Sequence, residues 1–249
     1  MSQTILSYFT SFKYCLFSLD EFTGNEHELY ITEYFPYGLM LSFNELIVLV
    51  SAVAFDNPSV AICMFLYFMA TNPEVEQKLL SELAKHDDPL DCEYLEWCIK
   101  ESMRLFTTVG LIGRIMESDK PLVDSDGTEY HVPKGTHCFV SVESLHHDEA
   151  YWHEARKFRP ERFDPQSDEY KNRDMFAYLP FGYGRMCMGK SLVMKQMKLV
   201  LSMALKEFRF EVDTSKMSDK FEELEFDHLL TQYPQNGIHF RCFPRESKS

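Results

Sequence analysis

A glycine-rich segment with one cysteine is the first place where residue types and spacing indicate chemistry. In FGYGRMCMG, residues 181–189, three glycines surround Cys187, and Arg185 precedes the cysteine by two positions. A helix is expected directly after this segment, and the N-terminus of a helix favours a thiolate. The loop would hold an electron-rich sulfur toward a metal. The alternative is a buried cysteine that fills space as a small apolar residue.

A charged pair on a predicted helix is the second feature. Glu101 and Arg104 are three residues apart, which puts both on one helix face, and their neighbours are apolar. They form either a solvated ion pair of little energetic value or a buried pair that needs further partners. Arg162, within FRPERF, is the natural third member. Taken alone, that segment fits an arginine exposed in a loop better.

The elements that must position these residues follow from periodicity and turn signals. Helices are expected at 42–71, with a capping box of Ser42 and Glu45, and at 73–86, opened by Pro73. Two further helices are expected at 92–106 and 190–208. Strands are expected at 122–142, around a DSDGT hairpin turn, and again at 208–243, while 148–180 has little period. The class is therefore α+β, mainly helical, with small sheets.

Composition narrows the class of protein. The chain has 249 residues, 45% of them apolar, and a formal charge of −14, which makes a nucleic acid an improbable partner. Its 7 cysteines contain no C-x-x-C pair and fit a reducing compartment. No signal peptide is expected at the N-terminus. The apolar run 46–69 has Asp56, Asn57 and Pro58 at its centre and is expected to be a buried helix.

Taken in order, these motifs resemble one family, the cytochrome P450 haem-thiolate enzymes. The resemblance runs from about residue 46 to the C-terminus and rests on YLEWCIKESMRLF, Arg114, VPKGT, LHHDEAYW, FRPERF and the cysteine loop. It implies that Cys187 is the axial thiolate of haem b, which favours cleavage of the O–O bond. It also implies that Arg185 and Arg114 pair with haem propionates and that Phe181 lies in the cofactor site.

The resemblance assigns further roles. Glu101, Arg104 and Arg162 would form a structural charged network beside the haem. The substrate pocket would be lined by residues 53–57, 108–111 and 229–233. The implied fold is the C-terminal part of the cytochrome P450 fold.

The implied reaction inserts one oxygen atom from O₂ into an apolar substrate, a sterol or other lipid among the possibilities. Electrons would come from NADPH–cytochrome P450 reductase at the cytosolic face of the endoplasmic reticulum. Lys190, Lys195 and Lys198 would face that partner, although they fit better as lysines that solvate the helix.

The sequence departs from the family in two motifs. The cysteine loop is one residue short, because Phe181 and Gly184 each lie one position too close to the cysteine. At the centre of the distal helix the expected acid is Asp56, but Asn57 stands where an alcohol is usual. These two are the candidate catalytic residues. Asparagine can orient a water but cannot pass a proton through a hydroxyl.

The segment Asp56-Asn57-Pro58 resembles the branch that contains sterol 7α- and 12α-hydroxylases and prostacyclin synthase. This likeness leaves an isomerase of endoperoxides, which needs no external oxidant, as an alternative function. A simple proline kink with satisfied polar side chains is the other interpretation.

Length is the third departure. The family fold is about twice as long in outline, so we expect a chain incomplete at its N-terminus. The expected domains are an unassigned segment at 1–40 and the haem-binding portion at 41–249. A truncated, non-catalytic remnant of a haem protein is the third hypothesis.

Overall fold

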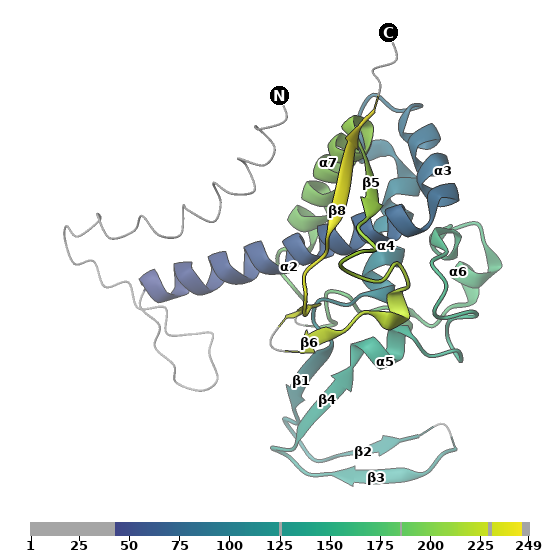
Figure 1. Ribbon diagram of the computed structural model, residues 1–249. Helices are drawn as coiled ribbons and strands as arrows, with labels where there is room; N and C mark the ends of the chain where they lie inside the picture. The colour runs from purple at the N-terminus through teal and green to yellow at the C-terminus, as the bar shows by residue number, and fades with distance from the viewer. Residues whose placement is uncertain (1–42, 125, 185, 229–230, 246–249) are drawn as a thin grey trace. The chain divides into compact units, whose positions relative to one another are not determined.

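The computed structural model describes residues 43–124, 126–184, 186–228 and 231–245. Contacts between residues divide the chain into two units, Met1–Ala52 and Val53–Ser249, and the second contains every candidate site described below. Its helices and short strands confirm the predicted α+β class (Figure 1). The boundary expected near residue 41 stays a prediction.

Four helices predicted from periodicity are present. They are α2 (Phe43–Thr71), α3 (Pro73–Leu83), α4 (Glu93–Leu105) and α7 (Lys190–Glu207). Proline at the first position opens α3, because its missing N–H has no partner to lose there. Pro58 lies inside α2, and the helix continues through it. Ser42 of the expected capping box lies outside the described residues.

The main core lies where α3, α4 and α7 pack against one another and against the second half of α2. Helical spacing puts one apolar stripe of each helix inside, such as Met197, Leu201 and Leu205 on α7, which are all fully buried. Burial of each of these side chains contributes about 1.5–3 kcal/mol. The core therefore fixes the helix that follows the cysteine loop against the helix that carries Glu101.

The described strands all belong to two-stranded antiparallel sheets. The pairs are β1 (Leu111–Ile115) with β4 (His137–Ser141), β2 (Lys120–Val123) with β3 (Glu129–Val132), β5 (Phe208–Val212) with β8 (Phe240–Pro244), and β6 (Phe226–His228) with β7 (Gln232–Pro234). Figure 1 shows β5 and β8 beside α7, with which β5 is in contact. The DSDGT turn joins β2 and β3 as predicted. Strand β1 was not predicted, because its partner lies far along the chain.

The segment 148–180 is mostly irregular, as expected, but it contains short helical turns. These are η3 (Pro160–Phe163), α6 (Asp168–Asn172) and η4 (Met175–Ala177). A second small core of Trp152, Ala155, Phe163 and Ala177 holds the segment together. The other short helices are η2 (Pro89–Asp91), α5 (Val142–His146) and η5 (Phe221–Glu223). Residue 142, expected in a strand, begins α5 instead.

No helix in the described part of the chain is long and apolar enough to cross a membrane.

Candidate functional site

The cysteine loop is a tight turn that presents its thiol at the start of α7. Gly182 and Gly184 have φ angles of 76° and 74°, a conformation that glycine adopts without steric cost. The backbone N–H of Cys187 donates to the carbonyl of Phe181 at 2.9 Å, which closes the turn. The Cys187 side chain is exposed, and a Cβ on Gly189 would lie 3.6 Å from its Sγ. The sulfur is therefore accessible for ligation, and a cysteine buried as a small apolar residue is not what the structure shows.

An arginine on β1 holds the loop from the sheet side. The guanidinium of Arg114 donates from Nη2 to the carbonyl of Tyr183 at 2.9 Å and from Nη1 to that of Gly113 at 2.8 Å. Arg114 remains exposed, so donors are available for an acidic group. The other predicted propionate partner, Arg185, lies outside the described residues.

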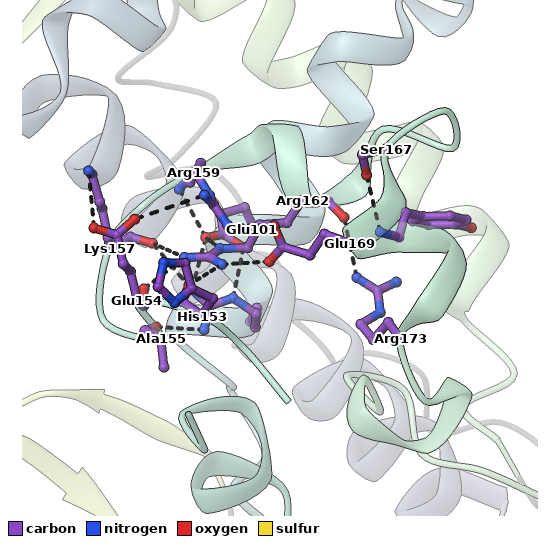
Figure 2. A network of polar contacts seen from close by, with 12 residues as sticks. Glu101, His153, Glu154, Ala155, Lys157, Arg159, Arg162, Ser167, Glu169 and Arg173 are labelled. Carbon is purple, nitrogen blue, oxygen red and sulfur yellow. Dashed lines mark hydrogen bonds and ion pairs between the residues drawn. The ribbon is translucent and has the colours of Figure 1, made fainter. Parts of the chain in front are cut away.

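Glu101, Arg104 and Arg162 come together in a fully buried network. Arg104 donates to both carboxylate oxygens of Glu101 at 2.8 Å, a bidentate pair. Arg162 donates to Oε1 of the same carboxylate at 3.2 Å. Figure 2 shows Glu101 within the network, near Arg159 and Arg162. The alternatives of a solvated surface pair and an exposed loop arginine do not describe this arrangement.

Backbone carbonyls, together with the carboxylate of Glu169 for Arg162, satisfy the remaining donors of the two guanidinium groups. Arg104 donates to the carbonyls of His146 and Ala155, both at 2.7 Å. Arg162 donates to the carbonyls of Glu154, at 2.7 Å, and of His153. Buried charges are tolerated only with such partners, so the network fastens the irregular segment 148–163 to α4.

The two candidate catalytic residues on α2, Asp56 and Asn57, differ in their exposure to solvent. Asp56 is exposed, and no contact among the described residues joins it to another candidate. Asn57 is half-buried, and its Oδ1 accepts a hydrogen bond from the hydroxyl of Thr231 at 2.8 Å. The backbone N–H of Gln232 donates to the carbonyl of Thr108 at 2.8 Å. Hydrogen bonds thus link the third predicted pocket segment, 229–233, to each of the other two, 53–57 and 108–111. Residues 229 and 230 lie outside the described residues.

A cavity of about 600 Å³ lies beside the cysteine loop, on the side of α4 and α7. Its lining includes Phe181, Tyr183 and Met186 of the loop, and the cations Arg173, Lys190 and Lys195. None of the described residues in 53–57 or 108–111 lines it, so it is not the predicted substrate pocket.

One lysine assigned to the helix surface is not exposed. Lys198 is buried, and its Nζ lies 3.0 Å from the Glu96 carboxylate and donates to the carbonyl of Leu90 at 2.8 Å. The expectation that Lys198 faces solvent or a partner was therefore wrong, because the side chain is used to join α7 to α4. Lys190 and Lys195 are exposed.

His146 is a buried residue of this region that the sequence reasoning missed. It lies in the LHHDEAYW motif. Its ring contacts Thr107, which follows α4, and Leu179, which precedes the cysteine loop. Burial lowers the pKa of its imidazole to about 3, and the nearby Arg104 charge adds to the effect. Its sequence context has no periodicity that distinguishes it from the neighbouring His147.

The described residues fit a haem group with one protein ligand. A thiolate is an established axial ligand of haem iron, and the exposed Sγ of Cys187 is free to approach a metal from the loop side. The exposed guanidinium of Arg114, which reaches the same loop, supplies charge-assisted donors for a carboxylate. We find no cluster of three or more histidine, cysteine or acidic side chains among the described residues, so the site differs from a multi-ligand metal centre.

Comparison with known sequences assigns the family. The sequence model of the family described as Cytochrome P450 matches residues 42–239. The chain belongs to the cytochrome P450 family.

Individual relatives agree with this assignment. The chain is 34% identical over 203 residues to cytochrome P450 4V2 of Pongo abelii. The aligned segment covers 77% of this chain and 36% of that protein. It is 33% identical over 181 residues to ultra-long-chain fatty acid omega-hydroxylase of Homo sapiens, covering 68% of this chain and 33% of that protein. It is 32% identical over 203 residues to lithocholate 6-beta-hydroxylase of Mesocricetus auratus, covering 77% of this chain and 38% of that protein. The chain thus spans about a third of the length of these relatives.

Proposed function

We propose that this chain carries the thiolate-ligand portion of a haem monooxygenase that oxidises an apolar lipid or sterol. The observation that supports the proposal is the exposed thiol of Cys187, on a loop closed by the Phe181 carbonyl and held by Arg114. The overall reaction would insert one atom of O₂ into a C–H bond and reduce the other to water with two electrons from a reductase and two protons from solvent.

Each residue near the loop has a defined task in this proposal. Cys187 would hold the haem iron through its thiolate, and haem b, when bound, would supply the chemistry that cleaves the O–O bond. Arg114 binds a propionate and keeps the loop against β1. The buried Glu101 network keeps α4 and the segment 148–163 in place and does not touch the reacting atoms.

The distal side depends on Asn57. With its Oδ1 held by Thr231, the amide nitrogen is left to donate a hydrogen bond or to orient a water. Because an amide does not relay a proton as a hydroxyl does, this feature also favours a second function, the rearrangement of an endoperoxide without external oxidant. The likeness to sterol 7α- and 12α-hydroxylases and prostacyclin synthase stays a prediction.

The partner and the location remain proposals from the family. The exposed Lys190 and Lys195, with Arg173, give the face beside the cysteine loop a positive character that suits an acidic reductase. The names of two relatives, a fatty acid hydroxylase and a lithocholate hydroxylase, support a lipid or sterol substrate. Association with the endoplasmic reticulum stays a prediction.

The proposal is tested by the spectrum of the reduced, carbon monoxide-bound chain after haem is added. A strongly red-shifted Soret band is expected in the wild type and in Cys242→Ala, the control for another exposed cysteine. The band should be lost in Cys187→Ala. A wild type without this band would contradict a thiolate haem site in the isolated chain and favour the non-catalytic remnant.

The two functions are separated by Asn57→Thr. A monooxygenase should consume NADPH with a reductase in the wild type, at a rate that this substitution changes. An isomerase should turn over an endoperoxide without NADPH. Product formation that needs no reductase would contradict the monooxygenase.

A further inference from the structure

The imidazole of His146 lies, fully buried, between α4 and the segment that enters the cysteine loop. The ring stacks on that of Tyr178 with 5.2 Å between centroids. Because burial keeps the pKa of His146 near 3, the ring is neutral in solution near pH 7. A neutral imidazole has one donor nitrogen and one acceptor nitrogen.

The neighbours of His146 decide which nitrogen carries the proton. The backbone N–H of Leu179 donates to Nε2 at 2.9 Å, so Nε2 is the acceptor. Nδ1 lies 2.9 Å from the hydroxyl of Thr107 and is therefore the donor. The Thr107 hydroxyl donates its own hydrogen bond to the carbonyl of Met103 at 3.3 Å. Every polar atom of this chain of contacts is satisfied in one tautomer.

Two hydrogen bonds, joined by the peptide bond between Phe181 and Gly182, connect Leu179 with the cysteine. The carbonyl of Leu179 accepts from the N–H of Gly182 at 3.1 Å, and the carbonyl of Phe181 accepts from the N–H of Cys187 at 2.9 Å. The imidazole thus fixes the first residue of a turn whose last bond is made by the cysteine itself.

The backbone of His146 is also fastened. Arg104, whose guanidinium pairs with Glu101, donates to the His146 carbonyl at 2.7 Å. The adjacent Tyr178 donates its hydroxyl to the carbonyl of Lys100 at 2.8 Å. The contacts with α4 therefore fix the position of His146, while Leu179 and Thr107 fix its tautomer.

We infer that His146 is a positioning residue for Cys187: its Nε2 accepts the Leu179 N–H and thereby sets the turn that presents the thiol. The inference rests on the proposed role of Cys187 as the iron ligand. It connects the buried charged network to the cysteine loop, since Arg104 holds the histidine and the histidine holds the loop.

Two substitutions separate the two hydrogen bonds of the ring. In His146→Gln the amide oxygen lies near the place of Nε2 and can still accept from Leu179, whereas His146→Asn keeps only a donor near the place of Nδ1. His147→Ala is the control. It removes the bond between His147 Nε2 and the Leu105 carbonyl, 2.9 Å long, and leaves Leu179 untouched.

The first readout is amide hydrogen exchange in the full chain without haem, resolved to single residues by NMR. We expect exchange at both Leu179 and Cys187 to rise about tenfold in His146→Asn, the effect of one lost hydrogen bond. It should stay near the wild-type rate in His146→Gln and in His147→Ala. If Leu179 exchanges faster while Cys187 does not, or if His147→Ala raises exchange at Cys187 equally, the inference is overturned.

The second readout is the reduced carbon monoxide spectrum of the haem-loaded chain. His146→Asn should lose a larger fraction of the red-shifted Soret band than His146→Gln at matched folded protein. Equal loss in both variants would contradict the inference. A wild type without the band would contradict the proposed function, while the exchange experiment would still test the positioning of Cys187.

Discussion

The hydroxyl of Thr231 donates to Oδ1 of Asn57 at 2.8 Å, although the two residues are 174 positions apart. Thr231 is buried and Asn57 half-buried, so water competes poorly for this bond. The contact joins α2 to the residue before β7 and fixes which end of the amide faces away from Thr231.

Substitutions of Thr231 should therefore separate the contribution of its hydroxyl to stability from that of its methyl group. Thr231→Val should lower the free energy of unfolding by about 1 kcal/mol, the net value of one hydrogen bond, and Thr231→Ser should restore most of it. Urea unfolding of these variants, combined with Asn57→Ala in a double-mutant cycle, measures the coupling. Additive effects in the cycle would show that the two side chains do not interact.

The buried network gives the largest predicted effect. Glu101→Gln keeps the shape of the side chain but leaves Arg104 and Arg162 without their shared carboxylate. We expect a loss of about 3–5 kcal/mol in the free energy of unfolding, because the buried guanidinium of Arg104 loses its only carboxylate partner among the described residues and that of Arg162 keeps only Glu169.

The matched control is Glu82→Gln, which removes the exposed ion pair between Glu82 and Lys85. Exposed pairs of this kind contribute little to stability, so the free energy of unfolding of this variant in urea should be close to that of the wild type. Similar losses in Glu82→Gln and Glu101→Gln would contradict the special status of the buried network.

Local signals in the sequence were enough for the four longest helices and for one hairpin. Pro73 opens α3 and DSDGT joins β2 to β3, and both signals act through the backbone of a few neighbouring residues. The charged network was also within reach, because a pair flanked by apolar residues must find further partners when buried.

Features that depend on distant partners could not be predicted in this way. Strand β1 exists because it pairs with β4, and the Asn57 amide is fixed by a threonine near the other end of the chain. Lys198 has the sequence context of a solvated helix residue, yet it points at Leu90 and Glu96. In each case the determining contact arises only when separate elements pack together.

Arg114 provides a test of the cofactor site. Its guanidinium reaches the loop carbonyl of Tyr183 and is proposed to bind a propionate. Arg114→Gln should speed the loss of haem about tenfold or more, because a charge-assisted hydrogen bond contributes about 1.5–3 kcal/mol.

The measurement is the rate of haem transfer from the loaded chain to an excess of a haem-free acceptor protein. Arg209→Gln is the control, since Arg209 is an exposed arginine that pairs with Glu211 on β5. Equal transfer rates in the two variants would argue against a role of Arg114 in haem binding.

Acid should destabilise the fold through two neighbouring histidines, the buried His146 and the half-buried His147. Burial lowers the pKa of His146 to about 3 and that of His147 to about 4, whereas both are near 6.5 in the unfolded chain. Below pH 6.5 the unfolded state therefore binds more protons than the folded state. The stability from these neutral rings is complete above pH 6.5 and is lost as the pH falls toward 4 and then 3.

Urea unfolding between pH 7 and pH 4.5 would measure this loss. Each of the two histidines adds a slope that approaches at most about 1.4 kcal/mol per pH unit. His146→Gln cannot take up this proton, so its stability should start lower at pH 7 and fall less steeply than that of the wild type. Parallel curves for the two proteins would mean that His146 already binds its proton in the folded state, and the assignment of a neutral ring that accepts from Leu179 would then fail.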